Sequence, residues 1–213
     1  MAYPYSKTET LADGAVHVAG LLLAVPASAI LLIQAAQNGA TLAPTGLYAA
    51  CMIFAFMASA IYHLSPIDQL RPLLNKIDHA AIYLKIAGTY TPLVMVIGSG
   101  FAYGILCIVW ALAAIGAVAK LWFWGTDGRG SLALYMLMGW LSVLLIWPMW
   151  VTLPGMALAL IVAGGLTYSL GTFVYAHKGM RFQNAIWHGF VLVASACFFA
   201  AILLSHWAHS PSI

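Results

Sequence analysis

Long apolar runs alternate along the chain with short polar breaks and with breaks that contain glycine or proline. A helix that crosses a bilayer needs about 20 mostly apolar residues. The runs of this length cover approximately residues 15–36, 45–64, 77–97, 101–123, 132–151, 156–175 and 185–207. The pattern predicts an all-α fold: a polytopic bundle of seven transmembrane helices forming one membrane domain over residues 1–213. Pro148 and Pro154 flank an aromatic cluster, which makes the end of the fifth span the least regular boundary.

Composition excludes several classes of protein. Of 213 residues, 64% are hydrophobic and 6% are charged, whereas a typical soluble domain is about 25% charged. This chain has too little polar surface for a soluble globule and too few cations for a nucleic-acid-binding module. Cys51, Cys107 and Cys197 lie in apolar runs and form no metal-type pair, so we expect them to be packing residues.

The lysines and arginines outside the third span all fall on one side of this arrangement. They precede the first span, follow the second and sixth, or lie at or after the end of the fourth: Lys7, Arg71, Lys76, Lys120, Arg129, Lys178 and Arg181. The other loops and the segment after Trp207 carry neither residue type. The positive-inside rule therefore predicts a cytoplasmic N-terminus and an external C-terminus.

Ionisable side chains from four spans fall at the predicted cytoplasmic side. His63 ends the second span, Asp78 and His79 begin the third, and His17 and His188 lie about one turn inside the first and seventh. Ionisable groups at membrane depth are costly, and they usually face the bundle interior at a functional site. The convergence predicts such a site near the cytoplasmic face.

The spacing of residues within two of these spans indicates which chemistry the ionisable layer could perform. Ser59 and His63 are four residues apart, as are Asn184 and His188, so each pair shares one face of its helix. Imidazoles from two helices and a carboxylate from a third could hold zinc, which in catalytic sites commonly takes three protein ligands and leaves one position for water. Zinc would acidify that water, and a neighbouring carboxylate could accept its proton.

Structural explanations for the same residues remain open. A histidine in a membrane helix can simply hydrogen-bond a neighbouring helix, which explains His17 at least as well as ligation does. Asp78 and His79 could cap the third helix, because a carboxylate near a helix N-terminus suits the helix dipole. Three further histidines are expected to be solvated at the membrane edge: His177, His206 and His209.

Several segments resemble one family in order and spacing. They are Ser59-Ala-Ile-Tyr-His63, the stretch from Asp78 to Pro92, the stretch from Ile186 to Leu192, and the opening Glu9…Asp13…His17…Gly20. On these residues the chain resembles the hemolysin III family, part of the wider class that contains the adiponectin and progestin receptors. The resemblance covers essentially the whole chain.

The resemblance implies seven helices, a cytoplasmic N-terminus and a Zn²⁺ site near the cytoplasmic face. It implies that His63 and His188 are metal ligands, that Asp78 is the base holding the reactive water, and that Ser59 lies beside the ligands. Relatives with this arrangement are similar to ceramidases, so membrane lipid is the implied substrate. We expect an integral protein of the bacterial inner (plasma) membrane.

The chain departs from the family pattern at Asn184, where the first histidine of the seventh-span pair is expected. An amide is a much poorer zinc ligand than an imidazole. Either His17, His79 or Asp78 completes the site, or metal is held weakly, or the site has lost its metal. Phe198 also replaces a position that is often histidine in the family.

Lys85 is the second departure, because an apolar residue is usual there in the family. It lies two helical turns beyond Asp78, about 10 Å along the axis. It either snorkels to the interface or points into a wet cavity, near Asp78 through water or near an anionic lipid head.

Three functions follow from these features. The first is a zinc-dependent hydrolase of a lipid amide or ester. The second is a membrane-homeostasis protein or one that handles protons or ions. The third is a cytolytic pore, which ranks last because the outer half of the bundle carries no polar stripe.

Overall fold

The computed structural model describes residues 6–38, 42–124, 129–177 and 179–208. Over these residues the chain contains no strand, and seven helical segments are long and apolar enough to cross a membrane. The first four are α1 (Lys7–Asn38), α2 (Leu42–Leu64), α3 (Arg71–Ile97, preceded by the 3-10 turn η1, Asp68–Leu70) and α4 (Gly100–Val118, continued by the π turn η2, Ala119–Phe123). The others are α5 (Arg129–Trp140) with η3 (Leu141–Leu145) and α6 (Ile146–Thr152), then α7 (Gly155–Ala176) and α8 (Gln183–Ala208). The predicted all-α, seven-helix membrane fold is confirmed.

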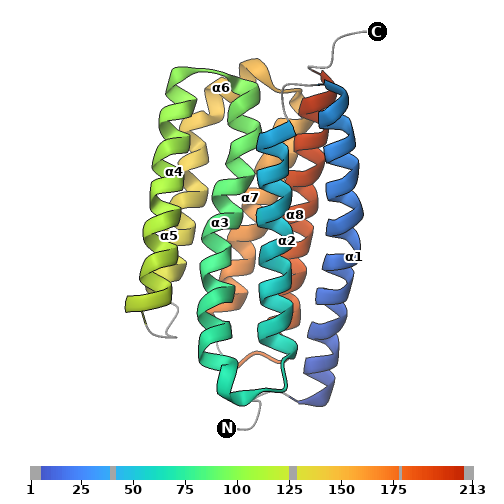
Figure 1. Cartoon of the computed structure of the whole chain (residues 1–213), viewed down its shortest axis with the longest axis vertical. Coiled ribbons are helices and arrows are strands. Elements are labelled where there is room, and N and C mark those ends of the chain that lie inside the picture. The colour runs from blue at the N-terminus through green and yellow to red at the C-terminus, as the bar shows by residue number, and fades with distance from the viewer. Residues whose placement is uncertain (1–5, 39–41, 125–128, 178, 209–213) are drawn as a thin grey trace.

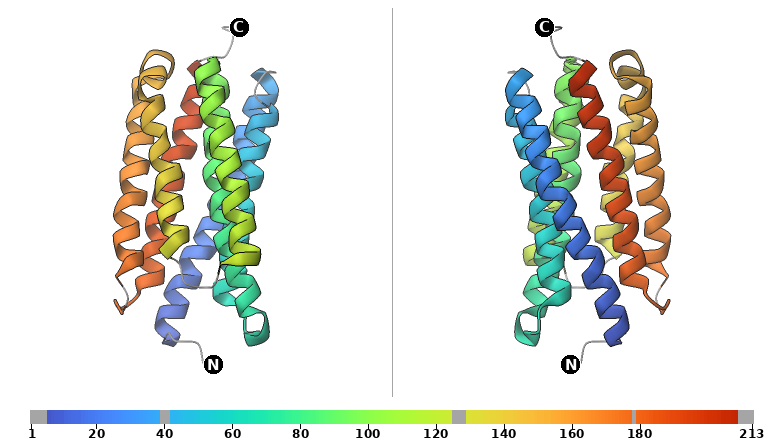
Figure 2. Two further views of the ribbon diagram at one scale, coloured as in Figure 1. Left: turned by 90° about the vertical axis from the view of Figure 1, so that its left-hand side faces the viewer. Right: turned by 90° about the vertical axis from the view of Figure 1, so that its right-hand side faces the viewer.

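The helices stand side by side along one axis, with α3 at the centre (Figure 1). α3 packs against α2 and α4, and it also contacts α5, α6 and α8. α8 packs between α7 and α1, and the views from the two sides show α1 crossing the bundle obliquely (Figure 2). The start of α1, the end of α2 and the starts of α3 and α8 therefore lie at one end of the bundle, where the ionisable layer was expected.

The two ends of the described chain lie at opposite ends of the bundle, as an odd number of spans requires (Figure 1). The end that faces the cytoplasm is predicted from the cations. Of these, Lys178 lies outside the described part of the chain. A reporter fused to the N-terminus should behave as cytoplasmic, and the same reporter at the C-terminus as external. Finding both reporters on one side of the membrane would contradict the topology.

α1 begins eight residues before the predicted apolar run because a capping box starts it. Ser6 Oγ accepts a hydrogen bond from Glu9 N (3.3 Å), and Glu9 Oε2 accepts one from Ser6 N (3.0 Å). The other oxygen of Glu9 accepts a hydrogen bond from Phe182 N (3.0 Å). Phe182 has a left-handed backbone (φ 59°), which is uncommon outside glycine. Glu9 thus joins the start of α1 to the residue that precedes α8.

The fifth span is interrupted inside its predicted range, at Leu141–Leu145, before the irregular end that Pro148 and Pro154 indicated. Pro148 has no N–H, and its ring crowds the carbonyl four residues earlier, at Leu144, so the chain forms the 3-10 turn η3 between α5 and α6. Tyr90 Oη donates to the carbonyls of Met138 (2.7 Å) and Gly139 (3.0 Å), just before this turn. A polar contact from α3 thereby stabilises the break.

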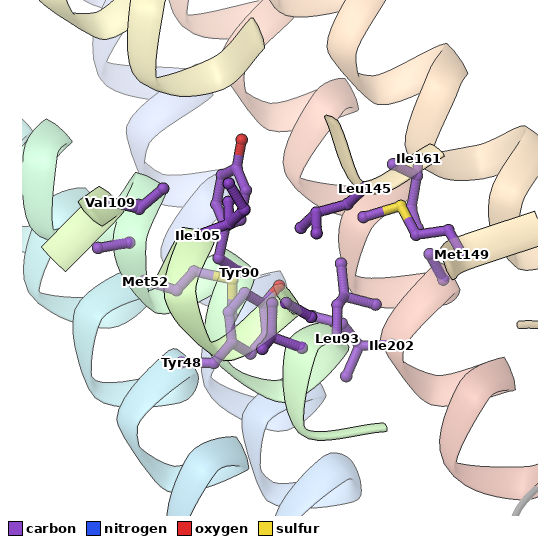
Figure 3. Packing of buried hydrophobic residues seen from close by; sticks show 14 of the residues in the cluster. Tyr48, Met52, Tyr90, Leu93, Ile105, Val109, Leu145, Met149, Ile161 and Ile202 are labelled. Carbon is purple, nitrogen blue, oxygen red and sulfur yellow. The ribbon is translucent and has the colours of Figure 1, made fainter. Parts of the chain in front are cut away.

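Buried apolar side chains pack together along the bundle (Figure 3), and many of them lie in the half away from the ionisable layer. Tyr48, Met52, Leu93 and Ile202 belong to this core, and each is at most 3% exposed. α2 and α3 approach closely at Gly88, where an added Cβ would lie 2.8 Å from Cys51 Cβ. This packing leaves the opposite end of the bundle for polar groups.

One expectation about the membrane edge is wrong. His206 was expected to be solvated, but it is 2% exposed because α8 continues to Ala208 and keeps this ring inside the bundle. His177 is exposed, as expected. His209 lies outside the described residues.

Candidate metal centre

A carboxylate and two imidazoles from α1 and α8 meet inside the bundle, at the end shown at the bottom of Figure 1. One ligand atom each from Asp13, His17 and His188 lie within 4.8 Å of one another. The three residues are 2%, 4% and 9% exposed. Asp13 and His17 share a helix face at a spacing of four, and the capping box with its link to Phe182 holds that face against α8.

Asp13 contacts three imidazoles through the nitrogen named Nδ1 in each. Its backbone oxygen accepts from His17 Nδ1 (2.8 Å), and its Oδ1 accepts from His188 Nδ1 (2.6 Å). Its Oδ2 lies 3.4 Å from His63 Nδ1. A carbonyl or carboxylate oxygen can only accept, so these contacts place the proton on Nδ1 of His17 and His188 and leave a lone pair on each Nε2.

Those two lone pairs converge on Ser59. Its hydroxyl oxygen lies 3.1 Å from His17 Nε2 and 3.4 Å from His188 Nε2. Since a serine hydroxyl has one proton, it can donate to only one of the two rings at a time. Two imidazole nitrogens directed at one point, each fixed from behind by Asp13, form the arrangement by which proteins orient metal-binding histidines.

The donor set fits a metal of the zinc type. Zinc takes imidazole nitrogen and carboxylate oxygen, and a catalytic site uses three protein ligands. Asp13 Oδ2 is buried and has no hydrogen-bond partner among the described residues, and it lies 3.4 Å from His63 Nδ1. A buried carboxylate oxygen without a hydrogen-bond partner needs an explanation, and a bound cation would supply the missing interaction.

His63 lies beside this group rather than apart from it. Its ring centroid is 4.6 Å from that of His188 and 5.5 Å from that of His17. Its Nε2 faces Asp78, with 3.9 Å between the nitrogen and Oδ2. The amide nitrogen of Asn184 lies 3.5 Å from His63 Nδ1, so position 184 adjoins the histidine cluster.

The ring of His79 belongs to a different set of contacts. Its Nδ1 donates to the Asn75 carbonyl (2.8 Å), and its Nε2 lies 3.2 Å from Tyr175 Oη. Its own carbonyl accepts from Tyr135 Oη (2.7 Å). His79 reaches the cluster only through Asp78, whose Oδ2 lies 3.7 Å from His79 Nδ1. Lys85 also stays out of the cluster, since its amine bonds Ser195.

Asp13 is the site residue that sequence reasoning missed. A carboxylate that precedes an apolar run is usually interpreted as a solvent-exposed residue outside the membrane. The capping box that extends α1 by two turns, and so places Asp13 inside the helix, was not expected. The feature that could have identified Asp13 is its spacing of four residues from His17, the same spacing that links Ser59 with His63. Ser195 was missed as well, because nothing local connects it with Lys85.

A cavity of about 620 Å³ leads away from the histidine cluster. His17, His63, Asp78 and His188 line one end of it, and apolar side chains of α3, α5, α6 and α7 line the rest. Five of its large apolar lining residues are also between 44% and 52% exposed on the outside of the bundle: Trp140, Val143, Ile146, Val162 and Leu166. The cavity therefore reaches the surface between α5 and α7, where membrane lipid would surround the helices.

Known proteins resemble the chain over most of its length. The family model described as Haemolysin-III related matches residues 5–199. The chain is 36% identical to Hemolysin-3 homolog of Bacillus subtilis (strain 168) over 202 residues, which are 93% of this chain and 95% of that protein. It is 35% identical to Hemolysin-3 of Bacillus cereus over 198 residues, 92% of this chain and 90% of the relative.

A more distant likeness extends to animals. Monocyte to macrophage differentiation factor of Homo sapiens is 29% identical over 154 residues, 69% of this chain and 63% of that protein. Both bacterial relatives exceed 30% identity over nearly their full length, and the family model spans the helices that carry the histidine cluster. The chain belongs to the Haemolysin-III related family of integral membrane proteins.

Proposed function

We propose that this protein is a metal-dependent hydrolase that cleaves an amide or ester bond of a membrane lipid. His17 and His188 would hold the Zn²⁺ through Nε2, with Asp13 orienting both rings, His63 beside them and Asn184 adjoining in place of a further imidazole. The observation that carries the proposal is the convergence of His17 Nε2 and His188 Nε2 at the polar end of a cavity open to lipid.

The metal and the polar groups around it would each have a separate role in hydrolysis. Zn²⁺ bound there would act as a Lewis acid that polarises the scissile carbonyl. Asp78 lines the cavity and lies 3.9 Å from His63 Nε2, so it is placed to accept a proton from the attacking water. Ser59, between the two Nε2 atoms, would hydrogen-bond the oxygen that reacts.

The shape and lining of the cavity support a lipid substrate. Its volume falls in the range of about 300–1,000 Å³ typical of ligand sites. Its walls are mainly apolar, and its opening lies among exposed apolar residues of α5 and α7. An acyl chain could enter from the bilayer and bring a bond near its polar end to the histidine cluster.

The cation distribution and the bacterial relatives support a location in the bacterial inner membrane. The histidine cluster would then act on the cytoplasmic leaflet. A cytolytic pore is the least favoured function, because the buried side chains of the core are apolar or tyrosine and form no polar stripe.

Proton handling without hydrolysis is a second candidate, favoured by a continuous series of titratable side chains. His63 lies 3.4 Å from Asp13 and 3.9 Å from Asp78, and Asp78 lies 3.7 Å from His79. His79 in turn reaches Tyr175 Oη at 3.2 Å. Such a series can exchange protons without any metal.

Turnover of a fluorogenic long-chain N-acyl amide by purified protein in lipid nanodiscs separates the two candidates. The wild-type protein should hydrolyse the amide, chelator should abolish the reaction, and Zn²⁺ should restore it. Asp78→Asn should lower kcat by about 10²–10⁴-fold while bound zinc stays unchanged, because Asp78 accepts the proton and does not hold the ion. Asp68→Asn, an exposed change in η1, is the control.

Hydrolysis that persists after complete chelation would contradict a metal-dependent reaction. A protein without hydrolytic activity, but with a proton flux in liposomes that Asp78→Asn removes, would favour the second candidate.

A further inference from the structure

Lys85 is a buried cation near the middle of α3, away from the histidine cluster. It is 9% exposed, and its Nζ donates to Ser195 Oγ at 2.8 Å. The amine also lies over two aromatic rings, 4.4 Å from the centroid of Phe56 and 5.5 Å from that of Tyr168. These contacts hold the ammonium group in one place.

Ser195 is fixed in turn and cannot balance the charge. Its hydroxyl donates to the Val191 carbonyl (2.6 Å), so its oxygen accepts from Lys85 and from Tyr168 Oη, which lies 3.1 Å away. An ammonium group has three N–H donors, and Ser195 takes one of them. Within the part of the chain that the structure describes, no carboxylate comes within 4.0 Å of Lys85.

A charge at this depth is costly unless an anion or several hydrogen bonds accompany it. The open side of the amine faces the cavity, since Lys85, Phe56 and Tyr168 all line it whereas Ser195 does not. The walls beyond them are apolar and include Ile161, and the opening toward lipid lies at Val162. Among the described residues that line the cavity, Lys85 is the cation within the apolar walls, whereas Arg71 lies at the start of α3, toward the histidine cluster.

We infer that Lys85 forms a binding site for the carboxylate of a long-chain fatty acid. The carboxylate accepts the two remaining N–H donors of Lys85, and the acyl chain lies along the apolar walls toward Val162. Ser195 is a positioning residue that holds the amine in place. Lys85 lies two helical turns beyond Asp78 on α3, about 10 Å along the helix axis. The site binds a ligand and does not depend on hydrolysis.

Equilibrium binding of labelled oleate to the purified protein in phosphatidylcholine nanodiscs tests this site. Oleate should bind about tenfold or more tightly than oleyl alcohol, because hydrogen bonds to a charged group contribute about 1.5–3 kcal/mol, and 1.4 kcal/mol is tenfold in affinity. The preference should remain in the presence of chelator. Loss of the preference on chelation would place the carboxylate at the metal and overturn the inference.

Variants locate the carboxylate. Lys85→Met keeps the apolar stem and should bind oleate and oleyl alcohol equally, whereas Ser195→Ala should weaken only oleate, by a few-fold. Lys76→Met removes another α3 lysine that does not line the cavity, and it should bind like wild type. Equal binding of the two ligands by wild-type protein, or an undiminished preference in Lys85→Met, would overturn the inference. Tighter binding of oleyl phosphate than oleate would overturn the carboxylate assignment.

Discussion

Asp13→Asn should lower the affinity of the protein for Zn²⁺ by about 10–100-fold, the usual effect of losing a group that orients metal-binding histidines. The asparagine keeps the size of the side chain but removes the negative charge. Oδ1 of Asp13 fixes His188, and its buried Oδ2 is the oxygen without a hydrogen-bond partner in the described chain. Titration against a competing chelator measures the affinity directly.

Asp68→Asn is the matched control for this change. Asp68 is an exposed carboxylate in η1 that pairs with Arg71 at 3.1 Å and does not line the cavity. Its loss should leave zinc affinity unchanged. If Asp13→Asn binds zinc as tightly as this control does, then Asp13 neither holds nor orients a metal, and the cluster is a structural hydrogen-bond network.

Asn184→His should raise zinc affinity by about tenfold or more, since imidazole is a much stronger zinc ligand than an amide. The structure places the Asn184 amide nitrogen 3.5 Å from His63 Nδ1, one helical turn before His188. A histidine there joins the cluster without movement of any helix. At a zinc concentration of about 100 times Kd, binding stabilises the fold by about 2.7 kcal/mol, so the melting temperature should depend on zinc.

The double variant Asp13→Asn/Asn184→His shows whether a further imidazole compensates for the missing carboxylate. Because Asp13 orients the histidines and a histidine at position 184 would supply a further ligand, the added imidazole should recover part of the affinity lost in Asp13→Asn. Gln183→His is the control, because it adds an imidazole one residue away on a different face of α8. An Asn184→His protein with unchanged affinity in both backgrounds would contradict a metal at this position.

Local sequence determines much of this fold. The seven spans follow from apolar length alone. In lipid the backbone hydrogen bonds must be made within the protein, and apart from a closed β-barrel only a helix does this. Two boundaries needed more specific chemistry. The Ser6–Glu9 capping box extends α1 beyond its apolar run, and Pro148 divides the fifth span into α5, η3 and α6.

The candidate site was only partly predictable. The residues Ser59, His63, Asp78 and His188 lie together, as their place in each span suggested. The role of Asp13 depends on how α1 crosses the bundle toward α8, a relation between segments 175 residues apart that helical periodicity does not contain. The contact between Lys85 and Ser195 joins residues that are 110 positions apart. It was not predictable for the same reason, because helical periodicity does not show how distant helices pack.

The central claim is that the imidazole and carboxylate groups at one end of the bundle bind a metal ion. Elemental analysis of the purified wild-type protein, beside a His17→Ala/His188→Ala variant, tests it most directly. We expect about one zinc ion per wild-type chain, removed by chelator and recovered on adding Zn²⁺, and little zinc in the folded variant. A folded wild-type protein that holds no metal and takes up none on titration would contradict the claim.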